Sequence, residues 1–209
     1  MDGVDAVLCD ISQTSCTTLA AHSIPYSAEL LTALNALCSE GPDELNSLAI
    51  ADRLVAETFA KVTLALLEKN NLHPSDITAI GSHGQTVRHH PNSDVLSAHF
   101  AESSIRGFTC QIGDPNTIAV LTGIDVIADF RRKDIALGGQ GAPLVPAFHN
   151  AVFASDDKHR ALVNIGGIAN VSLLAPKQDA SPPKGFDTGP GNTLMDQWIS
   201  LHLNPSFRT

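Results

Sequence analysis

Positively charged residues are scarce in this chain of 209 residues, which has 13 lysines and arginines against 22 aspartates and glutamates and a formal net charge of -9. Nucleic acids and anionic membrane surfaces attract basic proteins, so this balance argues against both as partners. Apolar runs are short, and none approaches the roughly 20 residues that a membrane-spanning helix needs. The N-terminus is acidic, unlike that of a secretory signal peptide. These absences favour a cytoplasmic protein without nucleic-acid or membrane partners.

Paired cysteines with metal-binding or redox spacing are also missing. The four cysteines are scattered and form no C-x-x-C motif; they are Cys9, Cys16, Cys38 and Cys110. Disulfide frameworks belong to small secreted chains, whereas a chain of this length with 43% hydrophobic residues can bury a substantial core. We therefore expect buried or idle thiols in a reducing cytoplasm.

Common nucleotide and metal motifs are absent as well. The chain contains neither a G-x-x-x-x-G-K-[ST] P-loop nor a G-x-G-x-x-G fingerprint. Three histidines, His89, His90 and His99, lie close together in sequence but have no ligand spacing such as H-E-x-x-H. Their surroundings are rich in Ser, Asn and Ala, which predicts a surface loop and no metal site.

Apolar β-prone runs alternate with amphipathic helices along the chain, which is typical of the α/β class. Strands are expected at 6–11, 14–24, 77–80, 109–112, 125–129, 161–165 and 168–174. Helices are expected at 27–39, 43–69, 117–122, 144–153 and from 193 onward. Ser27 is the expected N-cap of the first helix. The polar segment 156–160 is the expected boundary between one domain at 1–157 and a second that begins at 158.

Polar loops follow three of the expected strands, at 81–86, 113–116 and 129–142. Open α/β sheets bind ligands at the carboxyl ends of their strands, so these loops predict a small-molecule site. Its candidate residues are His83, Gln85, Asp114 and Arg131. An arginine can clamp a carboxylate or phosphate with two hydrogen bonds. The alternatives are a structured loop around the histidine and a solvated face with salt bridges around the arginine.

The segment 161–203 combines a glycine turn with a carboxylate. Gly166 and Gly167 separate two apolar strands, and glycine lets the backbone approach a ligand closely. Asp187 is expected at the mouth of a Gly-rich loop, just before a helix that begins near Thr193. A helix N-terminus offers unpaired N–H groups to an anion. This layout predicts phosphate handling with a carboxylate base nearby.

Five longer motifs occur in a fixed order along the chain. They are the segments Ser82–Thr86 (SHGQT), Gln111–Asp114 (QIGD), Asp129–Ala147 (DFRRKDIALGGQGAPLVPA), Asn164–Leu173 (NIGGIANVSL) and Phe186–Asn192 (FDTGPGN). With these motifs the sequence resembles the anhydro-N-acetylmuramic acid kinase family from its start to about residue 200.

The resemblance implies the sugar kinase/Hsp70/actin superfamily. The implied fold is α/β: an RNase-H-like actin/hexokinase-type domain, built as a mixed sheet with flanking helices, plus the start of a second such domain. It also implies that ATP and an anhydro amino sugar are the small-molecule substrates, with Mg²⁺ accompanying ATP. The implied reaction opens the 1,6-anhydro ring of the sugar with water and phosphorylates O6, as part of murein recycling. A homodimer is one assembly that the sequence leaves open.

The resemblance also implies roles for individual residues. Asp187 would be the catalytic base that activates the attacking water. The expected sugar contacts are His83, Gln85, Asp114, Arg131, Gly189 and Asn192. The expected ATP-phosphate contacts are Asp2, Gly3, Val4, Asp5, Gly166, Gly167 and Asn170. Asp2 and Asp5 are the residues that could reach a metal ion carried by ATP.

Two departures from the family pattern concern the ends of the chain. Residues 2–5 resemble the end of the family's first phosphate-binding motif, but the Gly-Thr-Ser with which that motif begins is absent. The sequence also stops at Thr209, early in the expected second domain. We therefore expect a truncated kinase in which the 209-residue chain binds ATP poorly or not at all. The alternative is a catalytically inactive, sugar-binding remnant of that kinase.

Overall fold

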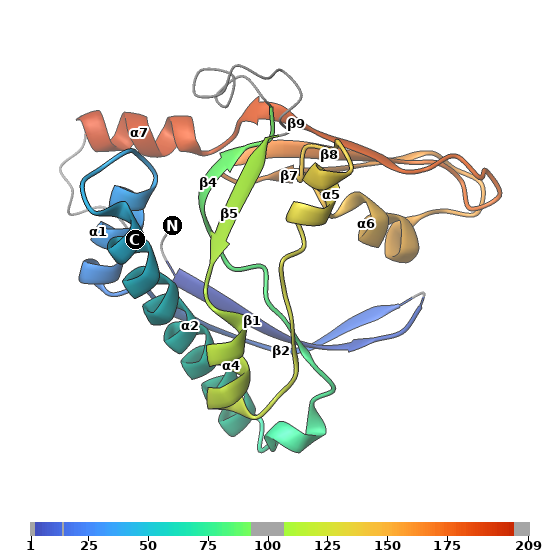
Figure 1. Cartoon of the computed structure of the whole chain (residues 1–209). Coiled ribbons are helices and arrows are strands. Elements are labelled where there is room, and N and C mark those ends of the chain that lie inside the picture. The colour runs from blue at the N-terminus through green and yellow to red at the C-terminus, as the bar shows by residue number, and fades with distance from the viewer. Residues whose placement is uncertain (1–2, 14, 93–106, 203–209) are drawn as a thin grey trace. The chain divides into compact units, whose positions relative to one another are not determined.

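The computed structural model of the chain describes residues 3–13, 15–92 and 107–202, and it contains both helices and sheets (Figure 1). Contacts divide the chain into two compact units. The first takes in residues 1–10 and 16–141, and the second takes in residues 11–15 and 142–209. The mixed α/β class expected from the sequence is confirmed. The domain boundary expected at residue 157 stays a prediction, because compact units need not coincide with domains.

The first unit contains three two-stranded pairings among its described residues. Its elements are β1 (Gly3–Ile11), β2 (Cys16–Pro25), α1 (Ala28–Leu37), α2 (Glu44–Lys69), a 3₁₀ turn (Pro74–Asp76), β3 (Ile80–Gly81), β4 (Gln85–His90), β5 (Phe108–Ile112), α4 (Pro115–Thr122), β6 (Val126–Ile127) and α5 (Arg132–Ala136). β1 pairs with β2, β3 runs parallel to β6, and β4 runs antiparallel to β5.

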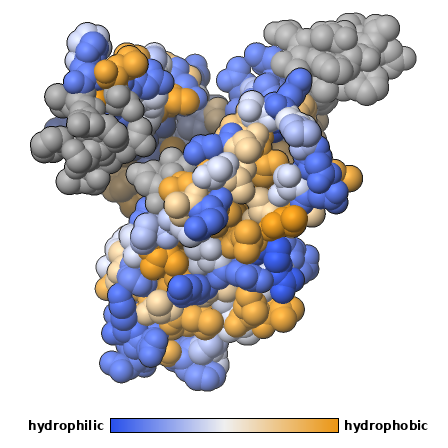
Figure 2. Space-filling model, turned by 90° about the vertical axis from the view of Figure 1, so that its left-hand side faces the viewer, coloured by the Kyte–Doolittle hydropathy of each residue, from blue (hydrophilic) through white to orange (hydrophobic). Residues whose placement is uncertain are grey.

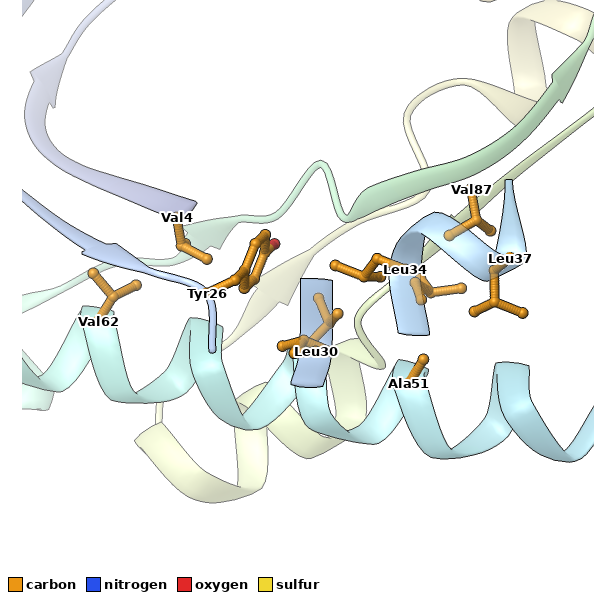
Figure 3. Close-up of a cluster of buried hydrophobic side chains, with 10 residues drawn as sticks. Val4, Tyr26, Leu30, Leu34, Leu37, Ala51, Val62 and Val87 are labelled. Carbon is orange, nitrogen blue, oxygen red and sulfur yellow. The ribbon is translucent and has the colours of Figure 1, made fainter. Parts of the chain in front are cut away.

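The core of the first unit gathers side chains from α1, α2, β1, β4 and β5 (Figure 3). Its buried members are Val4, Tyr26, Leu30, Leu34, Leu37, Ala51, Val55, Val62, Val87 and Ile112. Leu30, Leu34 and Leu37 share one face of α1, at the spacing of an amphipathic helix. Leu34 is fully buried, and burial of a leucine side chain contributes about 1.5–3 kcal/mol to stability.

Local signals at the helix ends are confirmed. Ser27 caps α1, and its hydroxyl accepts a hydrogen bond from the Leu30 N–H at 3.2 Å. α2 ends at Lys69, directly before Asn70. Gly123 ends α4 in the left-handed conformation, with φ of 71°. These signals depend on residues within one or two turns, which is why the sequence alone reveals them.

No helix among the described residues has the length and apolar character needed to cross a membrane.

The strand predictions were less accurate in the first unit. β3 and β6 have only two residues each, where four and five were expected. The surface loop expected around His89 and His90 is wrong for these two residues, because they lie in β4 and pair with β5. His89 forms a 2.9 Å hydrogen bond with the Thr109 hydroxyl, and the His90 ring lies 5.3 Å from that of Phe108. His99 lies outside the described residues.

Within its described residues, the second unit contains a three-stranded antiparallel sheet and two helices. Its elements are α6 (Pro146–Phe153), β7 (Arg160–Ile165), β8 (Ile168–Leu174), β9 (Lys184–Pro190) and α7 (Thr193–His202). α6 packs against β8, where Ser172 and Leu174 are buried and the His149 ring forms a 2.8 Å hydrogen bond with the Ser172 hydroxyl.

The other face of this sheet is apolar and open. Val163 lies opposite Val171, which in turn lies opposite Phe186, so all three share one face. Val163 is 65% exposed and Phe186 is 51% exposed. Apolar side chains of α7 are exposed as well, with Trp198 at 66%. Apolar patches lie between polar ones on the molecular surface (Figure 2).

Candidate functional site

His83 and Arg131 meet at the carboxyl end of the parallel pair β3–β6. Ile80 pairs with Val126, and Gly81 pairs with Ile127. The Ser82 N–H continues the ladder by donating to the Ile127 carbonyl at 2.8 Å. The two chain segments therefore leave the sheet side by side, and the loops after them share one edge. Two of the three polar loops that the sequence predicted to share one site therefore converge here, whereas the loop at 113–116 follows a strand of another sheet.

A direct hydrogen bond joins the two side chains. Arg131 Nε donates to His83 Nε2 at 2.7 Å, and His83 Nδ1 lies 2.8 Å from the Gly84 carbonyl. Since a guanidinium can only donate, Nε2 must be the unprotonated nitrogen, and Nδ1 carries the proton and donates to Gly84. Partial burial is the main cause that lowers the pKa of His83. The hydrogen bond to the Gly84 carbonyl raises this pKa, and the positive charge of Arg131 lowers it. The imidazole is therefore neutral at neutral pH.

Arg131 also holds the Gly-rich loop that follows α5. Its Nη1 donates to the Gly141 carbonyl, while the Gly141 N–H donates to Asp134 Oδ2 at 2.7 Å. The loop is tight: a Cβ at residue 139 would lie only 2.2 Å from Asp134 Oδ2. Asp134 is a positioning carboxylate that the sequence reasoning missed, and the only sequence signal for it is an acidic residue just before a glycine cluster.

Gln85 is the first residue of β4 and is held from within the protein. Its Oε1 accepts a hydrogen bond from the buried Tyr26 hydroxyl at 3.3 Å, and its Nε2 donates to the Thr86 carbonyl at 3.2 Å. Burial raises the pKa of Tyr26 to about 12, so the phenol stays protonated and able to donate. The expected sugar contact of Gln85 stays a prediction.

Asp114 follows β5 and caps α4. Its carboxylate accepts hydrogen bonds from the Thr117 hydroxyl at 2.6 Å and N–H at 2.9 Å, and from the Asn116 N–H at 3.1 Å. The Thr117 hydroxyl is the main cause that lowers the pKa of Asp114, with the Asn116 amide adding to it. β5 pairs with β4 and lies in a different sheet from β3 and β6. The structure therefore gives Asp114 a local capping role.

Replacing Asp114 by alanine is expected to lower the free energy of unfolding by about 1 kcal/mol at neutral pH, the usual contribution of an N-cap. The folded pKa lies below the unfolded value, so this stabilisation is present above about pH 4 and is lost as the pH falls through the lowered pKa. Urea unfolding at pH 7 and pH 3 measures the difference between the variant and the wild type. An equal difference at both pH values would contradict this assignment. The exposed Asp10→Ala is the control, with an expected change within about 0.5 kcal/mol.

Asp187 lies inside strand β9, so the prediction that it opens a loop is wrong. It pairs with Asn170 on β8, which pairs with Asn164 on β7. Directly opposite residues of adjacent strands share a face, so two amides and a carboxylate form a polar row across the sheet. Asp187 is exposed, next to a β-bulge at 169–170. Asn164 had no assigned role, and only the strand register reveals its place in the row.

The glycine turn between β7 and β8 holds the segment before α7. The Asn192 N–H donates to the Gly166 carbonyl at 2.8 Å, and the Gly191 N–H donates to the Gly167 carbonyl at the same distance. The Thr193 hydroxyl donates to the Gly167 carbonyl at 2.7 Å. The Gly191 and Asn192 N–H groups just before α7 therefore already have partners within the turn, and anion binding at the first turn of α7 stays a prediction. Gly189, with φ of 138°, lies near the end of β9, and Asn192 directly precedes α7.

Gly3, Val4 and Asp5, three of the expected ATP-phosphate contacts, are part of strand β1. The Val4 side chain belongs to the core, and the Asp5 carboxylate accepts a hydrogen bond from the Ser23 hydroxyl. Asp2 lies outside the described residues. Within the described ranges, no group of three or more His, Cys, Asp or Glu side chains is placed to hold a metal ion.

Comparison with known proteins gives one consistent family. A model of the family described as anhydro-N-acetylmuramic acid kinase matches residues 1–208. The curated relative of that name from Shewanella denitrificans is 57% identical over 207 residues, which is 99% of this chain and 52% of the relative. Those from Shewanella loihica (56% over 199 residues; 95% and 50%) and Shewanella amazonensis (56% over 207 residues; 99% and 53%) are similar. The chain spans about half the length of the curated relatives that it matches.

Proposed function

Because this chain belongs to the anhydro-N-acetylmuramic acid kinase family, we propose that it serves the ATP-dependent opening and phosphorylation of 1,6-anhydro-N-acetylmuramic acid. Water adds to C1 of the sugar, the C1–O6 bond breaks, and O6 takes the γ-phosphoryl group of ATP. The products are N-acetylmuramic acid 6-phosphate and ADP. The observation that carries the proposal is the family match over residues 1–208, which includes every candidate residue named above.

Asp187 is the proposed general base. A carboxylate can take the proton of a water molecule that it orients by hydrogen bonding, and such catalysis contributes about 10²–10⁴ in rate. Its exposed position on β9 leaves it open to a ligand, and its neighbour Asn170 carries an amide that can donate to the carboxylate.

Arg131 is the proposed group for the negative charge of the sugar. Muramic acid carries a carboxylate, and a guanidinium binds carboxylates with fixed geometry. His83, Gln85, Asp114, Gly189 and Asn192 are the further proposed residues of the sugar site. Asp114 would contribute to this site indirectly, because it caps and so positions the start of α4.

Gly166, Gly167 and Asn170 of the β7–β8 turn, together with residues 2–5, are the proposed phosphate contacts. Glycine allows the ATP phosphates to approach the backbone closely. Mg²⁺ would arrive with ATP, held by its phosphates and by Asp5 as the described carboxylate of that segment, and when bound it would offset charge on the transferring phosphoryl group.

The proposed architecture is a pair of RNase-H-like domains, of which residues 158–209 belong to the second. The open apolar face of the β7–β9 sheet supports this, because a sheet face of this kind is normally covered by another layer. We place the reaction in the cytoplasm, where ATP is available, and a homodimer remains the proposed assembly.

A coupled assay of ADP release tests the proposed function. It is run with anhydro-N-acetylmuramic acid on this chain and on a chimera that adds the unmatched remainder of the Shewanella denitrificans relative. Sugar-dependent ADP release by the chimera is the expected result. If the sugar binds but neither protein releases ADP, the chain is a binding module instead. The absence of both sugar binding and ADP release would overturn the proposal.

A further inference from the structure

We propose that His83 is a positioning residue, whose neutral imidazole fixes the guanidinium of Arg131 in the orientation that binds an anionic ligand group. His83 itself then makes no required contact with the sugar. The inference rests on the proposed function in one respect, namely that Arg131 receives the carboxylate of the sugar. The positioning itself depends only on contacts within the first unit.

The backbone brings the two residues together without help from the side chains. Because the pairing of β3 with β6 fixes Gly81 opposite Ile127, the residues that follow each strand must leave the sheet at the same edge. His83 lies two residues beyond β3, and Arg131 lies four residues beyond β6. Both strands are short, so a side-chain contact just past their ends adds a constraint that the two-residue ladder alone does not supply.

Two hydrogen bonds to described residues hold the guanidinium. Nε donates to His83 Nε2 at 2.7 Å, and Nη1 donates to the Gly141 carbonyl. A planar group held at two nitrogens cannot rotate about its own axis, so its orientation is determined. A guanidinium carries five N–H donors, and these two hydrogen bonds use one at Nε and one at Nη1.

Each of the two acceptors is itself fixed by a further hydrogen bond. His83 Nδ1 donates to the Gly84 carbonyl at 2.8 Å, which selects the tautomer with Nε2 free of a proton. The Gly141 N–H donates to Asp134 Oδ2 at 2.7 Å. The arrangement resembles the outer hydrogen bonds that orient ligating residues at metal sites, where the supporting groups determine the direction of the contacting ones.

Protonation of His83 would destroy this arrangement. The imidazolium has no acceptor nitrogen, and it would place a second positive charge beside Arg131. Among the described residues, charged groups near the pair include Asp134, through Gly141, and the ion pair of Asp129 with Arg132 on the neighbouring segment. We therefore expect the orientation of Arg131 to be lost in acid.

Nuclear magnetic resonance of the 209-residue chain tests the positioning directly. Long-range ¹H–¹⁵N spectra at pH 7 should show His83 Nε2 unprotonated and Nδ1 protonated. The Arg131 Nε–H signal should exchange slowly with solvent in the wild type, about tenfold faster in His83→Ala, and again slowly in His83→Gln, whose side-chain oxygen can accept the same hydrogen bond. A protonated Nε2 at pH 7, or an exchange rate unaffected by His83→Ala, would overturn the inference.

Calorimetric titration with anhydro-N-acetylmuramic acid measures the consequence for binding. The dissociation constant should rise about tenfold in His83→Ala, the upper range for one hydrogen bond, and should return to within about threefold of the wild type in His83→Gln. The exposed His159→Ala is the control and should bind like the wild type. Equal losses in the alanine and glutamine variants would mean that His83 contacts the sugar, which contradicts the inference.

The two tests separate this inference from the proposed function. If the wild type binds no sugar while the resonance experiments give the expected pattern, the positioning holds and the proposed substrate is wrong. If the sugar binds and the resonance pattern is absent, the substrate holds and the positioning is wrong.

Discussion

Replacing Asp187 by asparagine is expected to lower turnover by about 10²–10⁴, the range that a positioned general base contributes. The amide keeps the shape of the carboxylate but cannot take a proton from water. Because Asp187 is exposed and asparagine keeps the shape of its side chain, the substitution should leave the fold and sugar binding unchanged. The measurement is sugar-dependent ADP release by the chimera described above, with calorimetric binding of the sugar in parallel.

The control for this experiment is Asp196→Asn. Asp196 is an exposed acid in the first turn of α7, so it offers the same chemical change on the same unit outside the proposed site. Its turnover should stay near that of the wild type. Turnover unchanged by Asp187→Asn would rule out the role of Asp187 as base, whereas equal losses in both variants would indicate a general sensitivity of the second unit to charge.

Asn170 belongs to the same polar row as Asp187. Asn170 lies opposite Asp187, and its amide is the nearest neighbour that the strand register assigns to the carboxylate. Its assignment as a phosphate contact and its position beside the proposed base are compatible, because phosphoryl transfer needs the base and the phosphates close to the same sugar. The register therefore connects two roles that the sequence treated separately.

Replacing Arg88 by alanine is expected to lower the free energy of unfolding by about 2–3 kcal/mol, since three hydrogen bonds of about 0.5–1.5 kcal/mol each are lost. Arg88 Nε donates to the Leu37 carbonyl at 2.9 Å, and Nη2 donates to the Ser39 carbonyl at 2.6 Å and to Glu44 Oε1 at 2.9 Å. A single side chain on β4 thus holds the end of α1, the segment after it and the start of α2.

Burial makes this interaction larger than that of an ordinary surface pair. The Arg88 side chain is 22% exposed, and its removal takes away the donor that reaches the partly buried Leu37 carbonyl. The Gly41 N–H is the main cause that lowers the pKa of Glu44, and Arg88 lowers it further. This carboxylate is therefore ionised at neutral pH and accepts the hydrogen bond from Arg88.

Urea unfolding at neutral pH measures the effect, and Arg53→Ala is the matched control. Arg53 forms a 2.9 Å ion pair with Glu57 one turn away on α2, but its side chain is 61% exposed. Exposed helix pairs of this kind contribute about 0.3–0.5 kcal/mol. A loss below about 1 kcal/mol in Arg88→Ala, or losses of equal size in both variants, would show that Arg88 does not link the two helices.

The longer helices of this protein and their ends follow from the sequence, whereas the short α5 lies in a segment that was expected to be a loop. Leu30, Leu34 and Leu37 mark the buried face of α1, Ser27 marks its start, and Gly123 marks the end of α4. Each signal acts between residues a few positions apart, so it exists before the chain folds. The family was also recognisable from sequence motifs, and the comparison confirms it over residues 1–208.

The tertiary structure alone determines which residues lie together. Pairing of β4 with β5 places His89 in a strand, and pairing of β8 with β9 moves Asp187 from an expected loop into the polar row with Asn170. His83 and Arg131 are 48 positions apart, and only the pairing of β3 with β6 brings them within hydrogen-bonding distance. These pairings join strands that no short turn connects, so no local pattern encodes them. The sequence therefore identified candidate residues, but their hydrogen-bond partners became visible only in the folded chain.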